Sequence, residues 1–172
     1  MSNRFGYVLL LVALVIAALD PLELRAETAV LLDQFGVPGS LAENAGSVQV
    51  VIVVSAKRLR RIKPWERALR EQFGDLPVLR VADLPPTSSA THEQVAGKLA
   101  KRLPPDLSVL IDLEGRWAGT HGLDTSVPNL LLFAGNGQLI AREAGMFSAS
   151  GFAEFATRVQ DALDGGAEQA VP

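Results

Sequence analysis

The side chains that most often carry out chemistry in proteins are scarce in this chain. It has no cysteine and only two histidines, His92 and His121. Without cysteine there is no disulfide, no thiolate nucleophile and no thiolate metal ligand. A zinc site made of three histidines is equally impossible, so carboxylates would have to supply most ligands of any metal site. Thiol–disulfide and peroxidase activity are therefore excluded, and we predict neither a catalytic residue nor a cofactor.

His121 is the residue most open to a chemical role. Asp112, Glu114 and Asp124 lie close to it in the sequence, and with one of them it could form a weak metal or acid–base site. A packed or surface histidine explains the same residue without any chemistry, and His92 fits a solvated position in the first turn of a helix. We therefore predict no metal site and keep a site at His121 as an alternative.

Positive charge is concentrated in one short segment. Residues 57–63 hold five of the 16 basic residues and no acidic residue, in a chain whose net charge is −3. That net charge is too small to indicate nucleic-acid binding. Backbone N–H groups at a helix start and arginine side chains both suit carboxylate or phosphate, so the segment is a candidate site for an anion or an acidic partner. The candidate residues are Lys57, Arg58, Arg60, Arg61 and Lys63.

A solvated helix face is the other interpretation of this segment. The helix that follows has opposite charges four positions apart, Glu66 with Arg70 and Arg67 with Glu71, which are typical of ordinary surface ion pairs. Positive charge near a helix N-terminus also opposes the macrodipole, by about 0.3–1 kcal/mol for each cation. Both interpretations stay open at the level of the sequence.

The N-terminal residues predict export. Arg4 is followed by the apolar run Phe5–Leu19, which as a helix would be about 22 Å long, shorter than the ~30 Å apolar core of a bilayer. A secretory signal peptide over residues 1–26 therefore fits better than a transmembrane helix. Leu24 is larger than the ideal residue three positions before a cut after Ala26, so an uncleaved membrane anchor is the alternative. The predicted location is periplasmic or secreted, or at the inner membrane through this segment alone.

The rest of the chain predicts one domain over residues 27–164 and a flexible tail over residues 165–172. The almost wholly apolar, β-branched run 48–55 is typical of a central strand that is buried on both faces. The next expected elements are a helix with an apolar face from Ile62 to Phe73, a strand at 76–82, a helix at about 91–102 and a strand at 107–112.

The C-terminal part predicts a β-hairpin and a closing helix. Gly135-Asn136-Gly137 separates the apolar runs 130–134 and 138–142, and Asn-Gly between two such runs is a strong hairpin signal. A helix from about 150 to 163, capped by Ser148 or Ser150, closes the domain. The whole order of elements predicts a three-layer α/β/α sandwich with a mixed central sheet.

Four stretches carry a resemblance to a known family. They are Asp33-Gln34-Phe35-Gly36 with Ser40-Leu41, the strand 48–55 with the helix after it, residues 110–115 with Trp117-Ala118 and His121-Gly122-Leu123, and Val127-Pro128 with 130–133 and 137–140. In this order they resemble the thioredoxin superfamily, and most closely its peroxiredoxins, Sco-type proteins and periplasmic reductases of the cytochrome-maturation type. The resemblance spans about residues 30–163 and implies a thioredoxin-like fold.

The resemblance does not extend to the family's redox residues. If Pro64 matches the proline of the family's active-site helix, the two cysteine positions fall on Ala56 and Leu59, and neither side chain can form a thiolate. The resemblance also implies a cis peptide bond between Val127 and Pro128, in a loop that lies beside the family's active site and contacts the bound partner. Val127 and Pro128 therefore join the basic segment as candidate partner-binding residues.

Three functions are compatible with these residues. The first is an exported, redox-inactive domain that binds or scaffolds a partner, a periplasmic or membrane protein of acidic character. The second is a small-anion or metabolite binding protein, or a non-thiol enzyme, that uses the basic helix N-terminus. The third is a weak metal carrier of the Sco type that relies on His121.

Overall fold

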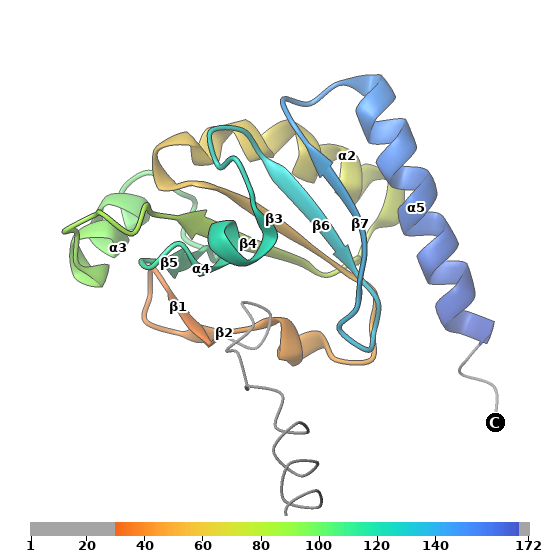
Figure 1. Cartoon of the computed structure of the whole chain (residues 1–172), viewed down its shortest axis with the longest axis horizontal. Helices are drawn as coiled ribbons and strands as arrows, with labels where there is room; N and C mark the ends of the chain where they lie inside the picture. Colours follow the sequence, from red (N-terminus) through yellow and green to blue (C-terminus); the bar gives the residue numbers. More distant parts are fainter. Residues whose placement is uncertain (1–29, 169–172) are drawn as a thin grey trace, which may run out of the picture.

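The computed structural model describes residues 30–168, so the predicted leader at residues 1–26 lies outside the described residues. In this range the chain forms one mixed sheet with helices on both faces (Figure 1). The strands are β1 (Leu31–Asp33), β2 (Pro38–Gly39), β3 (Gln49–Ser55), β4 (Val78–Asp83), β5 (Leu110–Asp112), β6 (Asn129–Phe133) and β7 (Leu139–Ala144). The α-helices are α2 (Lys63–Phe73), α3 (His92–Ala100), α4 (Arg116–His121) and α5 (Ala149–Glu168), and the 3₁₀ helices are η2 (Leu41–Asn44) and η3 (Ala56–Ile62).

Strand β3 lies inside the sheet, whose strand order is β2-β1-β5-β4-β3-β6-β7. It pairs in parallel with β4 and antiparallel with β6. Its residues Val50–Val54 have an exposed fraction of 0% each, so both faces of the strand are covered. The predicted central strand, buried on both faces, is confirmed.

The helices divide unequally between the two faces of the sheet. The parallel strands β3, β4 and β5 follow one another in a single direction across it, so right-handed crossovers place α2 and α3 on the same face. Phe155 and Val159 of α5 pack into the apolar cluster on that face. Trp117 of α4 packs into a second cluster on the opposite face. The predicted three-layer α/β/α sandwich is confirmed.

A 3₁₀ helix that the sequence pattern did not predict precedes α2. Ala56, Leu59 and Ile62 recur at a spacing of three, which matches the 3.0 residues per turn of a 3₁₀ helix and puts them on one side. Beyond Ile62 the buried residues are Trp65 and Leu69, at α-helical spacing. Pro64 lies in the first turn of α2, where its missing N–H removes no intrahelical hydrogen bond. The change of spacing marks where one kind of helix passes into the other.

Two further elements differ from the sequence-based expectation. The short helix α4 was not predicted, and its start is held by Asp112, whose carboxylate accepts hydrogen bonds from the backbone N–H groups of Glu114 (3.3 Å) and Trp117 (2.9 Å). Helix α5 continues to Glu168 rather than ending near 163, so residues 165–168 of the expected tail are helical. The predicted cap of α5 is confirmed, since Ser148 Oγ accepts a hydrogen bond from the N–H of Gly151 at 3.1 Å. No described helix is long and apolar enough to cross a membrane.

The turn between β6 and β7 touches the chain just before β3. The N–H of Gly46 donates a hydrogen bond to the carbonyl of Gly135 at 2.8 Å. A Cβ atom at position 135 would lie 2.6 Å from the backbone carbonyl carbon and oxygen of Gly46, closer than atoms can approach. Position 135 therefore requires glycine because a second backbone occupies the space beside it.

Replacing Gly135 with alanine should separate these two segments and lower the free energy of unfolding by about 1–3 kcal/mol, the usual cost of overpacking. Urea denaturation followed by circular dichroism measures the change. The control is Gly119→Ala in α4, where a Cβ meets no atom within 4 Å, so stability should stay within about 1 kcal/mol of the parent. Equal stability of the two variants would contradict the close approach at Gly135.

Candidate functional site

The carboxyl end of β3 is joined to the loop that precedes β6. The N–H of Ser55 donates a hydrogen bond to the carbonyl of Thr125 at 2.9 Å. The next residue, Ala56, is the first residue of η3. The basic segment therefore begins at a strand–helix junction that lies against the loop containing Val127 and Pro128, as the sequence predicted.

The structure divides the basic segment into two sets of side chains. Arg58 Nη1 and Arg61 Nη1 each donate a hydrogen bond of 2.7 Å to the carbonyl oxygen of Ser126. These two guanidinium groups thus attach η3 to the loop before Pro128, and their role in the fold is to hold the two segments together. Lys57, Arg60 and Lys63 point elsewhere.

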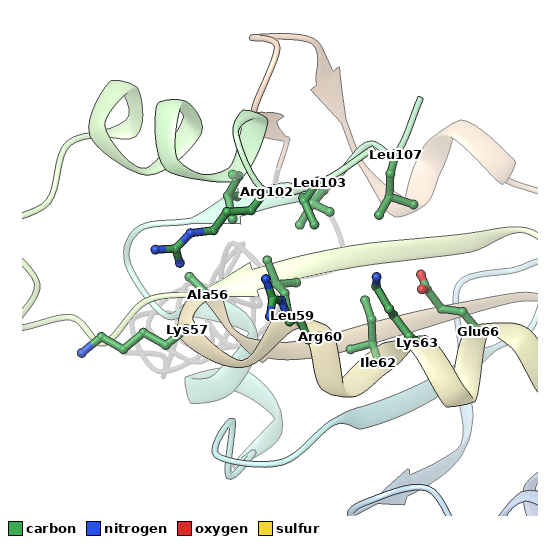
Figure 2. A pocket seen from close by; sticks show the side chains of 12 residues that line it. Ala56, Lys57, Leu59, Arg60, Ile62, Lys63, Glu66, Arg102, Leu103 and Leu107 are labelled. Carbon is green, nitrogen blue, oxygen red and sulfur yellow. The ribbon is translucent and has the colours of Figure 1, made fainter. Parts of the chain in front are cut away.

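Lys57, Arg60 and Lys63 line a groove of about 610 Å³ (Figure 2). One side of the groove is formed by η3 and the first turn of α2, and the other by the end of α3 and the residues that follow it. Arg102 enters the groove from the opposite side, as Figure 2 shows. Among the described residues, none of these four cations has a hydrogen-bond or ion-pair partner. The remaining lining is mainly apolar and consists of Ala56, Leu59, Ile62, Leu99, Leu103, Leu107 and Val109. The groove therefore combines an apolar surface with four unpaired positive charges.

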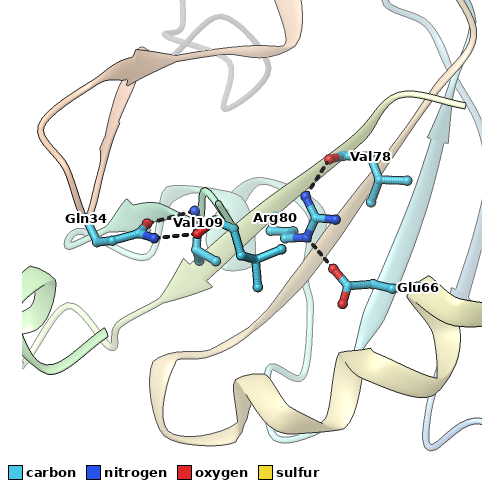
Figure 3. Close-up of polar contacts among 6 residues, drawn as sticks. Gln34, Glu66, Val78, Arg80 and Val109 are labelled. Atoms are coloured by element: carbon cyan, nitrogen blue, oxygen red, sulfur yellow. Dashed lines mark hydrogen bonds and ion pairs between the residues drawn. The ribbon is translucent and has the colours of Figure 1, made fainter. Parts of the chain in front are cut away.

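Glu66 is the one acidic residue that lines the groove, and its charge is already neutralised. Its carboxylate binds Arg80 Nε, and Arg80 Nη1 donates to the carbonyl of Val78 at 3.2 Å (Figure 3). Both side chains of this ion pair are largely buried. The expected surface pair of Glu66 with Arg70 is therefore wrong, because Glu66 faces the sheet and binds a cation from β4. No ion pair joins Arg67 to Glu71 in the described part of the chain.

The side chain of Gln34 holds the far wall of the groove. Its amide donates to the carbonyl of Leu107 and accepts a hydrogen bond from the N–H of Val109 at 2.9 Å (Figure 3). Ser108 Oγ, between these two residues, donates to Asp33 Oδ2 at 2.8 Å. Two residues that line the groove, Leu107 and Val109, and Ser108 between them are thus bound to the β1–β2 hairpin.

The peptide bond between Val127 and Pro128 is trans, since the described residues contain no cis peptide bond. The expectation of a cis bond is therefore wrong. Asn129 Nδ2 donates to the carbonyls of Val127 and Asp124, at 2.9 Å each, and so holds the loop in the trans form that X–Pro bonds ordinarily prefer. Pro128 is buried and Val127 is half-buried, so the loop offers little apolar surface to a partner.

The fold shifts the pKa values of two aspartates near this loop, Asp83 and Asp124, in opposite directions. The hydroxyl and the N–H of Ser126 donate hydrogen bonds to the exposed Asp124, and together with the charge of Arg58 they lower the pKa of its carboxyl. Burial raises the pKa of the Asp83 carboxyl, against the hydrogen bond from Thr125 Oγ1 (2.9 Å), and the neighbouring Asp112 raises it further. Asp83 Oδ1 has no hydrogen-bond partner.

His121 lies in an aromatic cluster rather than in a group of carboxylates. Its ring centroid is 5.5 Å from that of Trp117 and 6.2 Å from that of Phe133. Between residues 30 and 168, no three His, Asp or Glu side chains are grouped as the ligands of a metal ion would be. The metal-carrier hypothesis therefore has no ligand set in the described part of the chain.

Sequence reasoning missed the second wall of the groove. Arg102 and the apolar side chains from Leu99 to Val109 lie some forty residues beyond the basic segment and meet it only through the tertiary fold. One signal could have located them. Two consecutive right-handed crossovers put α2 and α3 on the same face of the sheet. Because η3 leads directly into α2, the end of α3 must lie on the same face as the basic segment.

Comparisons with known proteins show which fold this is. A scan against family models and a search of curated proteins gave no match. Three solved structures are similar over most of their length. The exposed lipoprotein thioredoxin Etrx1 of Streptococcus pneumoniae has a TM-score of 0.61 and 15% identity, covering 77% of this chain and 98% of that one.

The N-terminal domain of PilB from Neisseria gonorrhoeae has a TM-score of 0.62 and 14% identity, covering 79% of this chain and 89% of that one. BsSco, a member of the Sco family of cytochrome c oxidase assembly proteins, has a TM-score of 0.53 and 13% identity, covering 79% of this chain and 91% of that one. At these identities the likeness establishes the fold alone. The fold is thioredoxin-like, and the chain has no cysteine with which to perform thiol chemistry.

The raised pKa of Asp83 sets the sign of a pH dependence. Because its pKa is higher in the folded chain than in the unfolded one, the carboxyl stabilises the fold below its unfolded pKa, and this contribution is lost as the pH rises through the folded pKa. Asp83→Asn cannot ionise, so relative to the parent it should gain stability between about pH 4 and pH 7. Urea denaturation at several pH values measures the gain.

Asp124→Asn is the matched control, because the pKa of Asp124 is lowered and its contribution to stability is lost as the pH falls instead. This variant should show no gain between about pH 4 and pH 7. A constant difference between Asp83→Asn and the parent across that range would show that the fold does not raise the pKa of Asp83.

Proposed function

We propose that this protein is an exported, redox-inactive thioredoxin-like module that binds an acidic segment of a partner protein in the groove lined by Lys57, Arg60, Lys63 and Arg102. The observation that carries the proposal is the division of the basic segment. Arg58 and Arg61 are bound to the Ser126 carbonyl, whereas the four groove cations have no partner in the described structure. Exposed cations elsewhere in the described residues, such as Arg67 and Lys98, also lack a partner, so what distinguishes these four is that they line one groove, where a single external anion could contact several of them.

Apolar contact and charge would both contribute to the affinity. Exposed ion pairs contribute only about 0–1 kcal/mol each, whereas apolar surface contributes about 25 cal/mol for each Å² that is buried. The four cations would select a partner of negative charge and would increase the rate at which it associates. A segment that alternates carboxylates with aliphatic side chains is complementary to such a groove.

Ala56 and Leu59, the positions at which the resemblance places the family's cysteines, both line this groove. Apolar side chains there can contact a bound segment but cannot exchange electrons or form a bond with it. The partner would therefore be bound and released chemically unchanged, as expected for a scaffold or a capture module.

A small anionic ligand is the second candidate, and the size of the groove favours it. A volume of about 610 Å³ lies within the roughly 300–1,000 Å³ of small-molecule sites. Four cations around an apolar surface would suit a metabolite with carboxylate or phosphate groups. The carboxylate of Glu66 is engaged by Arg80, so the groove holds no carboxylate available as a general base, and carriage of the anion fits better than its conversion.

Removing the groove charges should weaken the binding of an acidic partner. In Lys57→Ser/Arg60→Ser/Lys63→Ser, the affinity for a fluorescein-labelled peptide of alternating Glu and Leu should fall by about 3- to 100-fold, since three exposed pairs at about 0.2–1 kcal/mol each amount to roughly 0.6–3 kcal/mol. Fluorescence anisotropy measures the affinity. The melting temperature should stay near that of the parent, because the three side chains are exposed.

The matched control replaces three exposed cations outside the groove, Arg67, Lys98 and Lys101, with serine. It removes the same charge and should keep the parent's affinity for the peptide. Equal losses in the two triple variants would show that net charge alone attracts the peptide. An unchanged affinity in the groove variant would reject the groove as the binding site.

A thermal-shift screen of small carboxylates and phosphates separates the two candidates. If the groove carries a metabolite, one of these compounds should raise the melting temperature of the parent and fail to raise that of the groove variant, by the linkage between binding and stability. Binding of the acidic peptide without any such shift supports the protein partner.

A further inference from the structure

The β1–β2 hairpin, whose tip is the turn of residues 34–37, and Val30 just before it expose more large apolar side chains than any other short segment of the described chain. Four of the seven large exposed hydrophobic residues in the described chain fall within eight consecutive positions. They are Val30, Leu32, Phe35 and Val37, with exposed fractions of 64%, 44%, 51% and 56%. Exposed apolar surface gathered in one place marks a contact with another protein or with a membrane.

Four backbone N–H groups of the hairpin, those of Asp33, Phe35, Gly36 and Val37, have acceptors within the hairpin itself. Asp33 Oδ1 accepts hydrogen bonds from the N–H groups of Phe35 (2.8 Å) and Val37 (2.9 Å). The N–H of Gly36 donates to the carbonyl of Asp33, and the N–H of Asp33 donates to the carbonyl of Val37. Backbone donors that already have partners can leave water at low cost, which is what entry into a lipid layer requires.

The charge of Asp33 is also withdrawn from the surface. The residue is buried, and its second carboxylate oxygen accepts a hydrogen bond from Ser108 Oγ. Between residues 30 and 56 the chain has no lysine or arginine. The tip therefore presents aliphatic and aromatic side chains without a cation, so a lipid contact would depend on apolar burial rather than on anionic headgroups.

The tip is held rigidly on the body of the domain. Strand β1 pairs with β5, and β2 pairs with β1, at the edge of the sheet (Figure 1). The hydrogen bonds of Gln34 to Leu107 and Val109 add a second attachment. A hairpin fixed in this way keeps its apolar side chains exposed and cannot fold them back onto the domain.

The chain outside the described structure indicates which surface the tip meets. The apolar run Phe5–Leu19 ends ten residues before Val30. Ten residues span at most about 36 Å when fully extended. If the run is embedded in a bilayer, the hairpin is the part of the described structure that lies nearest to it along the chain.

We propose that, in the chain that keeps its N-terminal apolar run as a membrane anchor, the tip of the β1–β2 hairpin enters the interfacial layer of that membrane and so orients the domain on the lipid surface. This inference is independent of the acidic partner proposed above, because it concerns a different surface and a different class of contact. The occupant of the tip is lipid, and its insertion is driven by apolar burial.

The absence of cysteine allows a direct test with the full chain. Val37→Cys, labelled with the fluorophore NBD, is reconstituted in phosphatidylcholine vesicles, and Gln72→Cys on the exposed face of α2 is labelled as the control. The label at 37 should show blue-shifted emission and quenching by doxyl-labelled lipids. The label at 72 should behave as in water. Adding Leu32→Ser and Phe35→Ser, both exposed positions, should reduce the blue shift at 37 without altering the melting temperature.

Three results would overturn the proposal. Equal, water-like emission from positions 37 and 72 would place the tip in solvent. A blue shift at 37 that doxyl lipids fail to quench would mean that protein, including the chain's own N-terminal residues, covers the tip. Insertion that requires phosphatidylglycerol would contradict an apolar contact, because the tip has no cation with which to recognise an anionic lipid.

Discussion

Burial of β3 on both faces is the constraint on which the rest of this structure depends. Its five central residues have no exposed surface, so each face of the sheet must be covered by other elements. Helices α2, α3 and α5 cover one face, and α4 covers the other. At the carboxyl end of β3 the chain lies against the loop that precedes β6, and η3 starts at this point. The position of the basic segment thus follows from the burial of the strand before it.

Two arginines bind the junction between β3 and η3 to the neighbouring loop. In the thioredoxin superfamily, which the sequence resembles, the corresponding junction presents cysteine. Here the guanidinium groups of Arg58 and Arg61 converge on one carbonyl oxygen of the neighbouring loop. The same loop is held from within by Asn129, and its proline is in the trans form. The junction is therefore fastened within the fold, and the positive charge that remains available lies to one side, in the groove.

The sequence predicted the layers of this fold well because they depend on local patterns. The β-branched run at β3, the Asn-Gly turn and the apolar spacing of α2 each reflect burial along a single element. The groove could not be predicted in the same way, since Arg102 and Leu107 reach Lys57 only through tertiary packing. Glu66 shows the limit most directly. The spacing of charges along the helix predicted that Glu66 would pair with Arg70, but in the structure it pairs with Arg80 from the sheet beneath the helix.

The side-chain amide of Gln34 connects the apolar β1–β2 hairpin to the wall of the basic groove. The Gln34 side chain extends from the β1–β2 hairpin and bonds to the backbone of Leu107 and Val109, two residues that line the basic groove. The pairing of β1 with β5 and the hydrogen bond from Ser108 to Asp33 join the same two parts of the chain. The hairpin and the groove wall that bears Leu107 and Val109 therefore belong to one connected unit of the fold.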